Sequence, residues 1–207
     1  EAPRDAAVED ARPRMKLAEA MALPHYRALL VSGFANGWAT FGVRIALVPL
    51  LAAHVPTIGA PMAGIALTLM AVGNVIAQQF TGRMVDALGR RPVLMVGLLV
   101  TGVTTLVFGW SESLPVFLGL SVLTGVGASM IQPASQAMLA DIIGADRNGG
   151  QALSTFSMST DLGSIAGTLL AGLIADVFGF GWAFFLTGCM LLVALFPWWR
   201  VGRTAAA

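Results

Sequence analysis

Long apolar stretches separated by short polar ones make up most of the chain. Six of them are long enough to cross the apolar core of a bilayer, which is about 30 Å thick and takes roughly 20 residues of helix. They span approximately residues 28–54, 61–80, 92–110, 115–139, 151–175 and 182–199. Backbone polar groups in lipid must be satisfied within each segment, so the pattern predicts an all-α membrane protein with six transmembrane helices.

The predicted helices form one transmembrane domain, residues 28–199, between two polar segments. We expect residues 1–27 to be a cytoplasmic linker or N-terminal segment and residues 200–207 to be a cytoplasmic tail. The composition agrees, because 57% of the residues are hydrophobic and 11% are charged, whereas a soluble domain carries about 25% charged residues. A soluble globular protein is therefore excluded.

Charge and cysteine content limit the expected partners. A net charge of +1 gives no reason to expect nucleic acid as a partner. Cys189 is the one cysteine, so no disulfide can form within the chain, and no cluster of metal-ligating residues accompanies it. We therefore expect no metal site and no cofactor.

Basic residues are distributed unevenly across the predicted topology. All but one of the 12 Lys and Arg residues fall on one side, and the exception, Arg44, lies within the first helix. The opposite connections, residues 55–60, 111–114 and 176–181, contain none. Positive residues favour the cytoplasmic side, so the pattern predicts a multi-pass protein of the plasma (inner) membrane with both termini in the cytoplasm.

Aromatic residues mark the predicted membrane interfaces. Trp110 and Trp182 are expected at the outer interface, and Tyr26, Trp198 and Trp199 at the inner one. Trp and Tyr are enriched at these levels because their rings are apolar with a polar atom. We therefore interpret all five as interface anchors.

A short pattern, G-x-x-x-D-x-x-G, occurs at the ends of the second and fifth predicted helices. Its copies are Gly82, Asp86 and Gly89, and Gly172, Asp176 and Gly179. These two helices cross the membrane in opposite directions, and only the first copy continues into two arginines. The pattern predicts two three-helix repeats of inverted topology, with positive charge kept on the cytoplasmic copy.

Four predicted helices carry polar residues at helical spacing on one face. These are Gly33, Asn36, Gly37, Thr40 and Arg44 in the first, Ala71, Asn74, Gln78 and Thr81 in the second, Gly125, Ser129, Gln132 and Gln136 in the fourth, and Ser154, Ser157, Asp161 and Ser164 in the fifth. We expect these helices to surround an interior or a wet cavity, with the third and sixth as outer supports. Helix packing through small and hydroxyl residues is the alternative.

Arg44 and Asp161 are ionisable residues deep in the predicted membrane region. A charge there costs at least about 2.5–3.5 kcal/mol, so such residues usually face a cavity or a partner. Asp161 is either a proton carrier or a structural residue that forms an ion pair or a hydrogen bond with a neighbouring helix end. Arg44 either contacts an anion in the cavity or acts as a structural counter-charge. The remaining candidates for a proton or substrate path are Asn36, Thr40, Trp38, Gln132, Gln136 and Asn74; Trp38 either stacks on a ligand or packs.

Asp86 has a predicted local role at the end of the second helix. Its carboxylate can accept hydrogen bonds from Arg90 or Arg91, or from the start of a neighbouring helix. Such a contact can hold one conformation closed. The alternative is that Asp86 only forms a turn and aids insertion.

The stretch GRMVDALGRR resembles the cytoplasmic-loop signature of major facilitator superfamily transporters, approximately G-x-x-x-D-R-x-G-R-R. The matching residues are Gly82, Asp86, Gly89, Arg90 and Arg91, whereas Ala87 stands where the family often has a basic residue. A second stretch, residues 133–149, resembles the segment before the family's fifth or eleventh helix. Its matching residues are Asp141, Arg147 and Gly149.

This resemblance implies one half of a twelve-helix transporter whose two six-helix halves enclose the substrate path. Because a charged segment without an initiating Met comes first and the chain ends soon after the last helix, we expect the C-terminal half. The implied function is secondary active transport of a small organic solute by alternating access, with proton-coupled efflux of drugs or metabolites as the first expectation. The implied partners are the bilayer, the solute and the other half.

Other functions fit the sequence less well. An intramembrane hydrolase would need a deep histidine base, but His25 and His54 both lie near helix ends, so we expect no enzyme. No TVGYG channel filter occurs. A non-transporting or homodimerising scaffold stays open, because Gly163 and Gly167 form a small-residue face that could contact a partner.

Overall fold

The fold was analysed in a computed structural model, which describes residue 13, residues 15–144 and residues 147–204. Residues 1–12 and 14 of the expected N-terminal segment lie outside this part. The last residues of the expected tail, 205–207, lie outside it as well.

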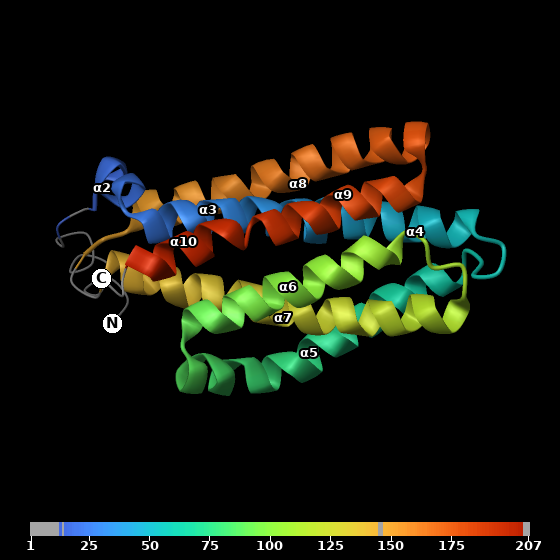
Figure 1. Ribbon diagram of the computed structural model, residues 1–207, viewed down its shortest axis with the longest axis horizontal. Coiled ribbons are helices and arrows are strands. Elements are labelled where there is room, and N and C mark those ends of the chain that lie inside the picture. Colours follow the sequence, from blue (N-terminus) through green and yellow to red (C-terminus); the bar gives the residue numbers. More distant parts are fainter. Residues whose placement is uncertain (1–12, 14, 145–146, 205–207) are drawn as a thin grey trace, which may run out of the picture.

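The described part of the chain is a bundle of helices (Figure 1). They are α2 (Leu17–Ala22), α3 (Pro24–Gly37), the π-helix η1 (Trp38–Arg44), α4 (Ile45–His54), α5 (Met62–Leu88), α6 (Arg90–Phe108), α7 (Leu114–Ile143), α8 (Gly150–Phe178), α9 (Phe180–Val193) and α10 (Phe196–Thr204). Helices α3, η1 and α4 are continuous and form the first span. By length and composition, 6 spans in this part can cross a membrane, which confirms the predicted number.

The helices extend further than the apolar pattern indicates. Residues 82–91, which lie between two predicted apolar segments and resemble a cytoplasmic-loop signature, do not form a loop, because α5 continues to Leu88 and α6 begins at Arg90. Gly89 alone separates them, at φ 90° and ψ 159°, a conformation that glycine adopts without a Cβ penalty. Apolar composition marks only the part of a helix that lies in lipid, so the charged ends were missed.

The bundle has two chemically different ends. One end contains the α5–α6 and α7–α8 connections with Arg90, Arg91 and Arg147, and we call it the basic end. The opposite end contains Glu112 and Asp176 near the α6–α7 and α8–α9 connections, and we call it the acidic end. In Figure 1 the basic end lies on the left and the acidic end on the right.

The six spans pack as two groups of three helices, and each group contains helices from both three-helix repeats. The first span packs against α8 and α9, whereas α7 packs against α5 and α6. Figure 1 shows the first group above the second, and α6 and α9 contact each other between them. Each three-helix repeat of the chain thus gives its first helix to the other group. The predicted pair of inverted repeats is confirmed.

Glycines allow the first span to approach α8 closely. A Cβ at Gly37 would collide with the backbone of Thr160, and a Cβ at Gly163 would collide with the carbonyl group of Phe34. Gly163 and Gly167 therefore pack inside this domain, Gly167 against Trp38. The small-residue face that supported a homodimerising scaffold is used internally.

The same contact recurs between α7 and α5. A Cβ at Gly125 would collide with the carbonyl group of Met70, and a Cβ at Gly73 would lie 2.6 Å from the carbonyl oxygen of Val122. Gly125 and Gly73 occupy the positions in this group that Gly37 and Gly163 occupy in the other. The inverted repeat therefore includes the helix contacts as well as the sequence pattern.

Two predicted interface anchors are buried instead. Tyr26 and Trp198 are both 0% exposed. The Tyr26 hydroxyl donates to the carbonyl of Ala152 at 2.8 Å, and the Trp198 indole donates to the hydroxyl of Ser32 at 2.8 Å. Aromatic residues near a helix end look alike in sequence whether they face lipid or a neighbouring helix. For these two residues the anchor interpretation was wrong.

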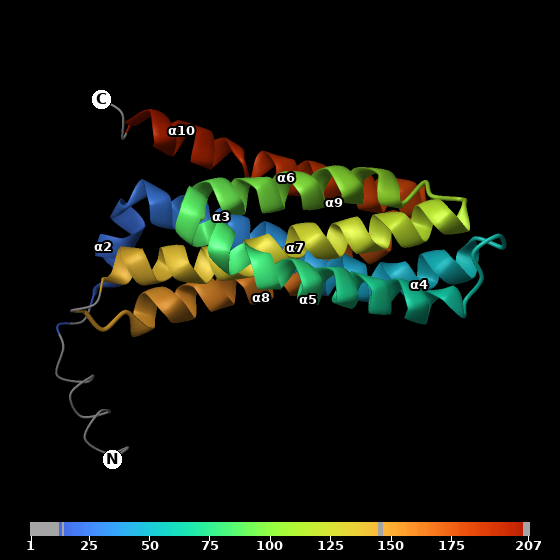
Figure 2. The ribbon, with the colours of Figure 1, turned by 90° about the horizontal axis from the view of Figure 1, so that it is seen from below.

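The other three aromatic residues remain exposed. Trp110 and Trp182 lie at the acidic end in an edge-to-face contact with ring centroids 6.4 Å apart, and Trp199 lies on α10 at the basic end. Figure 2 shows α10 continuing from the end of α9 along the margin of the bundle. Their exposure at the two ends fits interface anchors.

The glycine contacts predict a difference in stability between two glycine substitutions. Gly37→Ala should lower the melting temperature of the purified protein, because overpacking a tight contact costs about 1–3 kcal/mol. Gly119→Ala is the matched control, since Gly119 is also helical and has no atom within 4 Å of its built Cβ. Equal melting temperatures for the two variants would contradict the close α3–α8 contact.

Candidate functional site

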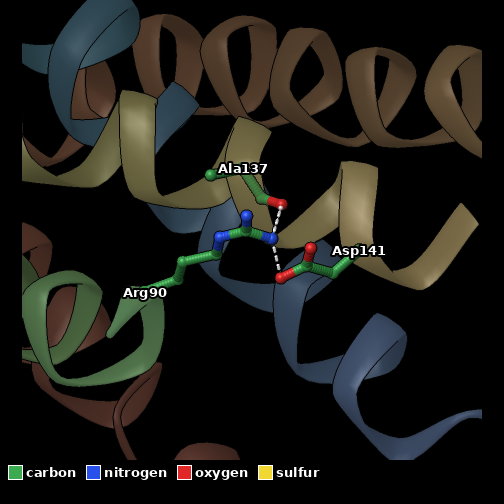
Figure 3. A network of polar contacts seen from close by, with 3 residues as sticks. All are labelled: Arg90, Ala137 and Asp141. Carbon is green, nitrogen blue, oxygen red and sulfur yellow. Dashed lines mark hydrogen bonds and ion pairs between the residues drawn. The ribbon is translucent and has the colours of Figure 1, made fainter. Parts of the chain in front are cut away.

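The two family-like segments meet at the basic end. Arg90, the first residue of α6, forms an ion pair with Asp141 near the end of α7. The same guanidinium donates to the carbonyl of Ala137 at 2.8 Å (Figure 3). Arg90 belongs to the first segment and Asp141 to the second, so one side chain fastens the start of α6 to the end of α7.

Asp86 does not have the partners that we expected. Its side chain is exposed, and among the described residues it forms no ion pair, whereas Arg91 donates to the carbonyl of Trp198. Gly89 separates α5 from α6 at a positive φ, and the partners of Arg90 and Arg91 at the start of α6 lie on α7 and α10. The arginines therefore reach other helices, and Asp86 stays available.

A cavity of about 650 Å³ lies beside this network. Its lining includes Asp86, Arg90, Asp141 and His25. The cavity therefore has both acidic and basic groups on its wall, and Asp86 contributes a carboxylate without an ion pair in the described part.

The remaining residues of the second stretch position the N-terminal segment. Arg147 forms an ion pair with Glu19 of α2 at 3.8 Å, and both side chains are more than half exposed. The backbone N–H of Met15 donates to the carbonyl of Asn148 at 3.0 Å. Gly149 precedes α8, and a Cβ there would collide with Ile143. Exposed ion pairs contribute little stability, so the backbone contact does more to hold the segment.

The candidate path residues divide by exposure. Asp161 on α8 and Gln132 and Gln136 on α7 are exposed, Asn74 on α5 is half-buried, and Asn36 on α3 is 6% exposed. Exposed polar groups at the middle of a transmembrane helix cannot face lipid without a large cost. The surface that carries Asp161 therefore needs a covering other than lipid.

Asn36, Thr40 and Trp38 make internal contacts. The Thr40 hydroxyl donates to the amide oxygen of Asn36 at 3.1 Å, and the Trp38 indole donates to the hydroxyl of Thr187 on α9 at 3.1 Å. Trp38 thus connects the first span to α9. This geometry agrees with the packing alternative for Trp38.

Arg44 ends the π-helix η1. Its Nη2 atom is shielded from solvent and has no hydrogen-bond partner, and Arg44 forms no ion pair with any residue that the structure describes. Asp161 is not its partner. The π-helix also shifts the residues after Trp38 around the helix axis, because its hydrogen bonds run from i to i+5. The single polar face expected from Gly33 to Arg44 is therefore interrupted.

A comparison with known families identifies the fold. The sequence profile of the Major Facilitator Superfamily matches residues 29–207. The chain belongs to the major facilitator superfamily. The two segments that the Arg90–Asp141 contact joins are those that resemble motifs of this family.

Known superfamily proteins match most of this chain. Multidrug resistance protein 2 of Bacillus subtilis (strain 168) is 30% identical over 166 residues, which cover 80% of this chain and 41% of that protein. Inner membrane transport protein YnfM of Escherichia coli (strain K12) is 25% identical over 185 residues, which cover 86% and 43%. The chain thus spans about two fifths of the length of these relatives.

Solved structures show the same fold. A peptide transporter POT in complex with sulfate superposes with a TM-score of 0.75 at 16% identity, covering 94% of this chain and 40% of that one. The POT family transporter PepTSo gives a TM-score of 0.74 at 20% identity, covering 87% and 37%. At these identities the likeness concerns the fold alone. In both comparisons the match covers less than half of the solved chain.

Sequence reasoning missed several partners of the site. The carbonyls of Ala137 and Trp198 and the side chain of Glu19 carry no sequence signal for these contacts, because any residue has a carbonyl and acidic residues are common in polar segments. The only available signal for the Arg90–Asp141 contact was that both residues lie at the ends of antiparallel helices.

In the described residues no three His, Cys, Asp or Glu side chains are grouped so that they could hold a metal ion.

The Arg90–Asp141 contact predicts a charge-swap rescue. Arg90→Asp and Asp141→Arg should each lower the melting temperature, because each places like charges together, at a cost of about 1 kcal/mol for a half-exposed pair. The double variant should recover part of the loss. Asp86→Asn is the control and should leave the melting temperature unchanged. Additive losses in the double variant would show that the pair is absent in solution.

Proposed function

We propose that this chain forms one six-helix half, the C-terminal one, of a secondary active transporter that works by alternating access. The transporter moves a small organic solute across the plasma membrane, with proton-coupled efflux of drugs or metabolites as the specific activity. Membership of the major facilitator superfamily and similarity to a multidrug resistance protein support this proposal. The observation that carries it is the exposed polar surface at the level of Asp161.

Helices α5 and α8 present long faces that this half does not cover. Only 22% of the most apolar window of each is buried, against 50% for the first span. Large apolar side chains on the α8 face include Met158, Leu162 and Ile165, all at least 60% exposed, and Asp161 lies among them. Lipid could cover the apolar residues but not the carboxylate. A second six-helix half, with a wet path between the halves, would cover both.

Asp161 is the proposed proton carrier. It lies about 17 Å along α8 from the basic end at a rise of 1.5 Å per residue, well inside a 29-residue helix. A carboxylate on the wall of a path that opens alternately can bind a proton on one side and release it on the other. Gln132, Gln136 and Asn74 would supply neutral hydrogen-bonding groups to the solute.

Arg44 and Asp86 have separate proposed roles. Arg44, whose guanidinium has no anionic partner in the described part of this half, would contact an anionic group of the solute or of the other half. Asp86 and the Arg90–Asp141 pair would form a cytoplasmic gate with the other half, made and broken as the halves rock.

Replacement of Asp161 tests the proton-carrier role. In proteoliposomes that contain the protein translated from the complete reading frame, Asp161→Asn should reduce solute transport driven by a proton gradient by about tenfold or more, since it removes the titrating group. Asp161→Glu is the control and should retain coupled transport. Unchanged gradient dependence in Asp161→Asn would remove Asp161 as the carrier.

Cysteine labelling tests the proposed orientation. In a Cys189→Ser background, Ala60→Cys at the acidic end should react with a membrane-impermeant maleimide added to intact cells. Ala87→Cys, which is also exposed but lies at the basic end, should react only after the cells are permeabilised. Labelling in the reverse order would place the termini outside the cytoplasm and contradict the proposed topology.

A further inference from the structure

The acidic end has a counterpart of the basic-end cavity. In the inverted repeat Asp176 and Gly179 correspond to Asp86 and Gly89, and both glycines have a φ of 90°. A cavity of about 410 Å³ lies beside Asp176 and Gly179, as the larger cavity lies beside Asp86 and Gly89. The fold thus produces two related cavities, one at each end, with different side chains on their walls.

The acidic-end cavity has aromatic walls where its counterpart has an ion pair. Phe180 takes the place of Arg90 as the first residue after the positive-φ glycine, and its ring lies 5.3 Å from the ring of His54 on α4. Trp110 also lines the cavity, and its indole packs against the backbone of Gly181. Ring faces carry partial negative charge and attract cations placed against them.

Carboxylates add negative charge to this aromatic wall. Glu112 and Asp176 line the cavity and are exposed, and neither forms an ion pair with a residue that the structure describes. The backbone carbonyl of Glu112 accepts a hydrogen bond from Thr57, which ties the α4–α5 connection to the α6–α7 connection. Residues 55–60, 111–114 and 176–181, which form this end, contain no Lys or Arg.

We propose that the acidic-end cavity is a binding site for a small organic cation such as a quaternary ammonium group. Its volume falls in the range of small-molecule pockets, about 300–1,000 Å³. Trp110, Phe180 and His54 would surround the apolar surface of the cation, and Glu112 and Asp176 would balance its charge. This site is separate from the path around Asp161, so it goes beyond the proposed transport function.

Direct binding tests this site without relying on transport. The probe is choline, titrated calorimetrically into the protein translated from its complete reading frame in lipid nanodiscs, where both ends are accessible. Its neutral isostere, 3,3-dimethylbutan-1-ol, has the same shape without the charge. Saturable binding of choline, with none of the alcohol over the same concentration range, is the expected result.

Matched variants locate the site. Glu112→Gln and Trp110→Leu should each weaken choline binding by about fivefold, the effect of about 1 kcal/mol of cation contact. Glu19→Gln at the basic end and Trp182→Leu, which contacts Trp110 but does not line the cavity, should change the affinity by less than about twofold. Asp176→Asn replaces Glu112→Gln if the latter does not fold.

Three results would overturn the proposal. They are the absence of saturable choline binding, equal binding of the neutral alcohol, and choline binding that Glu112→Gln and Asp176→Asn leave unchanged. Each is distinguishable from failure of the proposed transporter, because the gradient-driven transport of the Asp161 variants is measured independently. Loss of proton coupling in Asp161→Asn together with unchanged choline binding is the combination that supports both proposals.

Discussion

Direct backbone contact between helices at glycines is the constraint on which this fold depends. Gly37 and Gly163 bring the first span onto α8, and Gly125 and Gly73 bring α7 onto α5. In a bilayer, lipid is as apolar as the helix surfaces, so close packing rather than the hydrophobic effect holds helices together. Because each contact joins helices from different repeats, the two repeats interlock and cannot separate as independent bundles.

Interlocking determines which surfaces remain for function. Once the first span and α7 are packed by their glycine faces, α5 and α8 are left at the sides of the bundle with most of their surface uncovered. Asp161 therefore lies on an uncovered face, whereas Arg44 lies within the half with a shielded nitrogen. The two intramembrane charges are separated by the packing, so their partners must be sought in different places.

Periodicity and charge predict much of this structure and also show where sequence reasoning ends. The number of spans and the inverted repeat follow from apolar length and from the Gly89 and Gly179 pattern, which are local features. The burial of Tyr26 and Trp198 depends on carbonyl and hydroxyl groups far away in the chain, Ala152 and Ser32. The predicted polar face assumed a constant helical period, and the π-helix that ends at Arg44 shifts the residues away from that period. At the site, the topology indicates which helix ends lie together. It does not indicate which backbone carbonyl groups accept hydrogen bonds from Arg90 and Arg91.

The inverted repeat gives the two ends of the bundle the same backbone and different chemistry. Gly89 and Gly179 turn the chain in the same way, and an Asp precedes each by three residues. At the basic end the residue that follows is Arg90, which fastens α6 to α7 through Asp141; at the acidic end it is Phe180, which contacts the ring of His54. An ion pair in contact with water can break and re-form as charges approach it, whereas a ring contact offers a surface instead of a charge. The same glycine turn thus supports a polar contact at one end and an aromatic cavity at the other. The difference arises from a few side chains that follow each glycine.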